Sequence, residues 1–183
     1  MRKIIAVVFA VVLLLACTAA PAESGKESLG VLRVQKSFDI QYKTLPDDYS
    51  LTVYLQDDMM IFANIESSRT SLPRMGLVIA YNDQWAETER LNDLSEEEMQ
   101  VIRNSFAEEY GNLEFEIKET KYGTNLLVVE APSKLDAYVY TIYKGHEIEI
   151  HLFPGADQEA LTDADIDRVV AFLSDMDFVP VEE

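Results

Sequence analysis

The stretch DAYVYTIYKGHEIEIHLF, residues 136–153, contains both histidines of this chain. Apolar and polar residues alternate along its second half, and a period of two is typical of a half-buried β-strand. Its first half is rich in β-branched and aromatic residues, which favour strands. Lys144-Gly145 between the halves indicates a tight turn, so the stretch predicts a β-hairpin.

The same period argues against a histidine metal site. His146 and His151 are five residues apart, so in a regular strand they point to opposite faces. In a helix the two rings would be about 140° apart, and the zinc-protease pattern needs histidines four apart on one helix. The remaining metal option is Glu147, Glu149 and His151 on one strand face, with neighbours about 6.6–7 Å apart at the backbone. We interpret these three as a solvated polar face and predict no metal and no cofactor.

Further strand signals occupy the first half of the chain and the segment before the hairpin. Alternation or short apolar runs predict strands, and Pro46-Asp47-Asp48 and Asp57-Asp58 indicate turns. Gly123-Thr124-Asn125 indicates the turn of a second hairpin. The predicted strands cover residues 38–42, 51–56, 59–65, 76–81, 113–122 and 126–131.

Two helices are marked by their caps. Ser95 and Glu98 form a capping box, and Gly111 is a stop signal. Thr162 with Asp165 caps a second helix whose apolar stripe has helical spacing. Asp163, Asp165 and Asp167 also begin a calcium-loop spacing, but the sixth and twelfth positions hold arginine and serine instead of glycine and glutamate. The stripe consists of Ile166, Val169, Val170, Leu173 and Met176.

The order of strands, helix, strands and helix predicts an α+β domain with a largely antiparallel sheet. Short hairpin connections exclude a doubly wound parallel sheet across most of the chain. We expect one domain over residues 31–183, preceded by a flexible tether over residues 23–30.

The first 22 residues predict a signal peptide. Arg2 and Lys3 precede an apolar run over residues 4–16 that is too short for a membrane span. Ala20 and Ala22 form an A-x-A site, which predicts cleavage before Glu23 and a mature chain without a membrane span. The alternative is a lipobox over residues 14–17, with lipid attached to Cys17 and the protein held at the cell envelope.

Composition limits the classes of partner and of chemistry. The chain of 183 residues carries a formal net charge of −18 at pH 7, which repels phosphate backbones and makes nucleic acid an unsuitable partner. Cys17 is the only cysteine, so cleavage after residue 22 leaves no disulfide and no thiol nucleophile. The expected partner is an unknown extracellular or envelope component.

No sequence motif indicates an enzyme. The chain contains no G-x-S-x-G elbow, no G-x-G-x-x-G loop and no Walker loop. A hydrolase that uses paired carboxylates stays open, and it requires a cleft lined by two acids with perturbed pKa values.

Aromatic residues give the candidate binding residues. Tyr138 and Tyr140 share one strand face, Tyr143 comes at the following turn, and Trp85 is the only tryptophan. Rings of this kind favour sugars, peptides or protein partners. The alternative is that they pack beneath a helix.

The second half of the chain resembles the PsbP-like family, which includes photosystem extrinsic proteins and secreted bacterial proteins of unknown role. The resemblance is carried by TNLLVVEA, YVYTIYKGHEIEIHLF and LTDADIDRVVAFLSDMDFV. It implies a central antiparallel sheet with helices packed on both faces, an α/β/α sandwich, and it supplies no catalytic residues. The sequence thus predicts a secreted, non-enzymatic binding or interaction module, with a carboxylate-dependent extracellular hydrolase and a lipid-anchored envelope protein as alternatives.

Overall fold

The computed structural model describes residues 30–34, 38–42, 49–57, 60–120, 125–174 and 177–180. The predicted signal peptide with Ala20, Ala22 and Cys17, and the tether up to residue 29, lie outside these residues. So do the predicted turn over residues 46–48, most of the turn over residues 123–125, and Met176.

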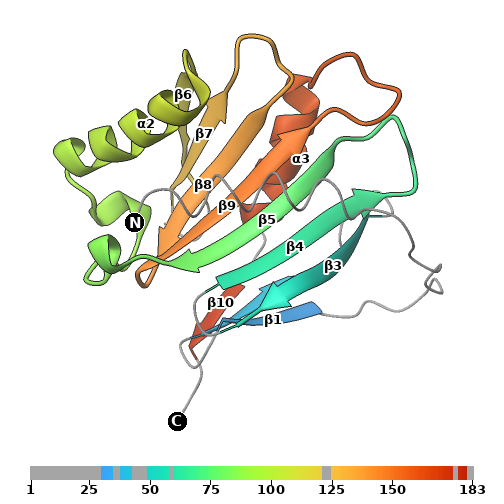
Figure 1. The fold of residues 1–183 in the computed structure, drawn as a ribbon. Helices are drawn as coiled ribbons and strands as arrows, with labels where there is room; N and C mark the ends of the chain where they lie inside the picture. Colours follow the sequence, from blue (N-terminus) through green and yellow to red (C-terminus); the bar gives the residue numbers. More distant parts are fainter. Residues whose placement is uncertain are drawn as a thin grey trace.

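One sheet of seven strands forms the body of the protein (Figure 1). Every pair of neighbouring strands in it is antiparallel, which confirms the prediction of an α+β fold with an antiparallel sheet. Across the sheet the order is β3 (Tyr49–Gln56), β4 (Met60–Ser67), β5 (Arg74–Tyr81), β9 (His146–Phe153), β8 (Ala137–Tyr143), β7 (Leu126–Glu130) and β6 (Glu114–Lys118).

The pairing of β5 with β9 joins the two halves of the chain. Ile79 lies opposite Ile148, and Leu77 lies opposite Ile150. Between these two, Val78 is also buried, so three consecutive β5 side chains are buried. β5 is therefore buried on both faces, which suits the short apolar run that predicted it.

A second, smaller sheet has three strands. It contains β1 (Gly30–Val34), β2 (Phe38–Tyr42) and β10 (Asp177–Pro180), with β2 in the middle and both pairs antiparallel. The sequence predicted β2. It did not predict β1 or a sheet separate from the larger one.

Both helices begin at the predicted caps. α2 (Glu96–Tyr110) starts after Ser95, which exchanges hydrogen bonds with Glu98, and ends at Gly111, whose φ of 89° suits glycine. α3 (Asp163–Ser174) begins after Thr162, whose backbone N–H donates to the Asp165 carboxylate at 2.9 Å. Among the described helices none is long and apolar enough to cross a membrane.

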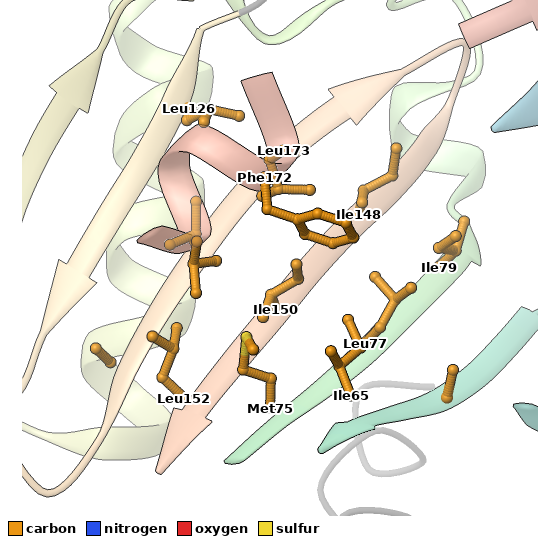
Figure 2. Packing of buried hydrophobic residues seen from close by; sticks show 14 of the residues in the cluster. Ile65, Met75, Leu77, Ile79, Leu126, Ile148, Ile150, Leu152, Phe172 and Leu173 are labelled. Carbon is orange, nitrogen blue, oxygen red and sulfur yellow. The ribbon is translucent and has the colours of Figure 1, made fainter. Parts of the chain in front are cut away.

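The first hydrophobic core lies between α3 and the strands. Figure 2 shows Phe172 and Leu173 of α3 beside Ile148 and Ile150 of β9, and each of these side chains is buried. Val34 and Ile40 of the smaller sheet belong to the same core.

The second core packs α2 against other residues of the same strands. Met99, Ile102 and Phe106 of α2 join Tyr138 and Tyr140 of β8. Along β8 these tyrosines alternate with Ala137 and Val139 of the first core. This core also includes Trp85 of η2 (Asp83–Trp85) and Leu91 of η3 (Leu91–Asp93).

Candidate functional site

Three polar side chains of β9 alternate with the apolar side chains of the first core. Glu147, Glu149 and His151 follow a strict period of two, as predicted, while Ile148, Ile150 and Leu152 lie in the first core. Because His146 is five residues from His151 in this regular strand, the two rings point to opposite faces of the sheet.

The carboxyl group of Glu147 lies at the edge of the second core. Trp85 Nε1 donates to Glu147 Oε1 at 3.0 Å, and the Tyr140 hydroxyl donates to the same oxygen at 2.9 Å. Both donors are buried, with exposed fractions of 3%. Burial, followed by the charge of Glu147, raises the pKa of Tyr140, so its hydroxyl keeps its proton for this bond.

Glu149 differs in its ionisation. In the sheet it lies between Val78 of β5 and Tyr140 of β8. The side chain is part-buried, and this burial raises its pKa to about 8. The charges of Glu147 and Glu109 add to the effect. At neutral pH the folded protein therefore holds Glu149 mainly in its protonated form.

His151 is buried beside aromatic rings. Its exposed fraction is 5%, and its ring stacks on Tyr138 at 4.1 Å between centroids. His151 Nε2 lies 3.0 Å from Asp136 Oδ1, while burial lowers the pKa of the imidazole. The prediction of a solvated polar face was wrong for this residue, because Tyr138 and Tyr110 of α2 cover it.

His146 occupies a different environment at the other face. Its ring meets the Tyr81 ring edge to face at 5.2 Å, and its Nδ1 lies 2.9 Å from the Lys144 carbonyl oxygen. Burial lowers its pKa. His146 and His151 therefore share no ligand geometry, and within the described residues no group of three or more His, Cys, Asp or Glu side chains is placed to hold a metal ion.

Acidic residues at the start of α3 take structural roles. The Lys134 ammonium donates to Asp163 Oδ1 at 2.7 Å. Asp165 is buried and accepts from Thr162, Gln158 and Arg168. The bonds of Asp165 agree with the predicted cap by Thr162 and Asp165, and Asp163 forms an ion pair with Lys134.

The predicted aromatic candidates belong to the cores. Trp85, Tyr138 and Tyr140 are buried in the second core, whereas Tyr143 is half-buried at the end of β8 and packs against the first core. The structure thus brings three of the four together and places Tyr143 apart from them.

Among the residues that the structure describes, the largest run of exposed apolar side chains lies instead on β3, one of the two edge strands of the large sheet (Figure 1). Val53, Tyr54 and Leu55 have exposed fractions of 38%, 51% and 40%. A register shift between Val53 and Leu55 marks a β-bulge. In the sequence, the alternation of LTVYLQ indicated the strand but contained no signal for its place at the edge.

The two edges of the large sheet differ in their protection. β6, at the opposite edge, has three charged residues among five: Glu114, Glu116 and Lys118. β3 has no charged residue in the eight residues YSLTVYLQ. Charged side chains and β-bulges both oppose the pairing of an edge strand with another chain, so β6 is protected by its charges, whereas β3 has only its bulge.

No protein-family model matches the chain, and no curated protein shows significant similarity to it.

Proposed function

We propose that this chain is a secreted, non-enzymatic binding module that recognises a protein partner outside a bacterial cell through the β3 edge. Secretion is supported by the signal-peptide pattern of the first 22 residues. The net charge of −18 favours a partner that is not a nucleic acid.

The observation that carries this proposal is the uncharged, apolar β3 edge. Val53, Tyr54 and Leu55 are exposed in succession on a strand without charges, whereas the opposite edge is charged. Extended segments of partner proteins bind such edges by adding a strand, whose backbone hydrogen bonds supply affinity.

We also infer the finer architecture, an α/β/α sandwich of the PsbP-like type. It is supported by the separation of two cores. Residues Val139 and Ile150 pack with α3, while their neighbour Tyr140 packs with α2. Adjacent residues of a strand point to opposite faces, so the two helices cover opposite faces of the sheet.

Affinity capture with matched variants tests the binding function. Mature protein beginning at residue 23 is immobilised and incubated with envelope extract, and bound proteins are then fixed by chemical cross-linking. The set of captured proteins is compared with those captured by Tyr54→Lys and Val101→Lys. Val101 lies on α2 with an exposed fraction of 39%, so its variant is a control for placing a lysine on an exposed apolar site. We expect Tyr54→Lys alone to lose a captured protein. Equal capture by both variants contradicts the proposal.

A carboxylate-dependent hydrolase is the second candidate, and one observation favours it. The Glu147 carboxyl accepts two hydrogen bonds, and the raised pKa of Glu149, two residues along β9, keeps Glu149 protonated at neutral pH. Hydrolysis of a glycosidic bond by such a pair would need one carboxylate to take a proton from water and the acid to protonate the leaving oxygen.

A panel of p-nitrophenyl glycosides tests this candidate. If it is correct, wild-type protein and Glu97→Gln release nitrophenol with a bell-shaped pH profile, and Glu149→Gln does not. Absence of release from the whole panel, or equal release by Glu149→Gln, counts against a catalytic role for the pair.

A further inference from the structure

The charges around the β3 edge indicate the chemistry of its partner. We propose that β3 accepts an extended peptide segment with an apolar centre and a basic residue near each end, which adds to the large sheet as a strand. This inference rests on the proposed function and specifies the partner of the same surface.

The backbone of β3 provides the docking line. β4 is its hydrogen-bonded neighbour in the sheet, and within the described residues no strand pairs with its other side. The N–H and C=O groups of alternate residues on that side are directed away from the sheet. Val53 and Leu55 flank this line, and the Tyr54 ring at the bulge is the most exposed of the three side chains.

Acidic side chains lie at both ends of the apolar strip that Val53, Tyr54 and Leu55 form. Glu66 of β4 is exposed and pairs with Ser50 near the start of β3, and Asp57 is exposed directly after the end of β3. From residue 50 to residue 57 an extended chain covers about 23 Å. A peptide of eight residues with a lysine at each end therefore places its two ammonium groups near the two carboxylates.

The same charges oppose a second copy of this chain. In a two-fold antiparallel pairing of β3 with β3, Asp57 of one copy approaches Ser50 and Glu66 of the other at each end. Like charges then face each other at both ends, between chains that each carry a net charge of −18. Charge complementarity thus favours a basic partner over self-pairing.

Synthetic peptides test this inference directly. The probe is the octapeptide KTVTVTVK, with ETVTVTVE as the charge-reversed control and KTVPVTVK as a control that cannot complete the strand ladder. Binding to mature protein is measured by isothermal titration calorimetry, and the contact surface by amide chemical shifts. At 50 mM salt we expect KTVTVTVK to bind and to change the amide chemical shifts of β3 and β4 alone. Both control peptides should bind about tenfold more weakly or not at all.

Paired variants locate the charges. The double variant Asp57→Asn, Glu66→Gln removes the two negative charges at the ends of the strip. The asparagine at position 57 keeps a side-chain oxygen that can accept the hydrogen bond from the Met60 N–H. Glu97→Gln with Glu108→Gln removes two exposed charges on α2. We expect the first pair to weaken KTVTVTVK binding by about fivefold or more and the second pair to leave it within about twofold.

The outcomes separate this inference from the proposed function. Equal binding of the two charged peptides, or equal effects of the two variant pairs, overturns the basic-ended partner. Sedimentation that shows a dimer of wild type and a monomer of Tyr54→Lys overturns it in favour of a second copy. If no peptide binds but Tyr54→Lys still loses the protein captured from envelope extract, strand addition by a basic-ended peptide is overturned and the proposed function stands. If Tyr54→Lys also retains capture, the proposed function falls as well.

Discussion

Replacement of Glu149 by glutamine should change how the stability of the protein depends on pH. The carboxyl has an ordinary pKa of 4.5 and a pKa of about 8 in the folded protein, chiefly because it is buried. Between these two values the folded state binds more protons than the unfolded state. Since stability then falls as pH rises, wild-type protein loses stability through this window.

The magnitude follows from the two pKa values. Ionisation of a buried carboxyl opposes folding by about 1.4 kcal/mol for each pH unit in this window. Between pH 5 and pH 8 the loss is about 3 kcal/mol, and glutamine, which does not ionise, does not undergo it. The free energy of unfolding of Glu149→Gln, relative to wild type, should therefore rise by about 3 kcal/mol over this range.

Trp85 provides the assay, because it is the only tryptophan and is buried in the second core. Urea unfolding of wild type, Glu149→Gln and the exposed control Glu97→Gln is followed by tryptophan fluorescence at pH 5, 6, 7 and 8. A constant difference between Glu149→Gln and wild type at all four pH values refutes the reasoning. A control that behaves like Glu149→Gln refutes it equally.

Four other predictions test separate parts of the structure. Burial lowers the pKa of His151, so below pH 6.5 the unfolded state binds more protons than the folded state and wild-type protein loses stability on acidification. His151→Gln should lose less stability than wild type between pH 7 and pH 4.5, as measured by urea unfolding at these two pH values. Tyr140→Phe removes a donor to a carboxylate and should lower the free energy of unfolding by about 1–2 kcal/mol at pH 7 in chemical denaturation. Gly155→Ala should destabilise by about 2 kcal/mol or more in thermal unfolding, because the added Cβ meets two backbone carbonyl oxygens of the facing loop. Intact mass of protein secreted by a bacterial host should match a chain that begins at Glu23, whereas a mass that starts at a lipidated Cys17 would replace secretion by anchoring at the envelope.

Local patterns were sufficient to predict most of the elements. The capping box of Ser95 and Glu98 defines the start of α2, and the period of two in residues 146–153 defines β9. Both signals depend on neighbours within a few residues, which a single sequence contains. The same holds for the Lys144-Gly145 turn, where both residues have positive φ.

Long-range arrangement could not be predicted in the same way. The pairing of β5 with β9, and of β10 with β2, joins segments that are far apart in the chain, and no local pattern specifies it. Alternation predicted which β9 residues share a face, but it did not predict that α2 and Trp85 cover that face. For this reason His151 was expected in solvent and is buried.

The candidate surface shows the same limit. Val53, Tyr54 and Leu55 were predicted to lie on a strand, and only the order of strands in the sheet places that strand at an edge. Conversely, Tyr138 and Tyr140 of β8 stood out in the sequence because they are aromatic, and they fill the second core.

Photo-cross-linking in living cells tests the role of the β3 edge most directly. A benzophenone amino acid replaces Tyr54 in one strain and Val101 in another, and irradiation traps whatever protein contacts that position. The account predicts a discrete adduct with a second protein at position 54 and none at position 101. An adduct at position 101 alone, or the same adducts at both positions, would contradict it.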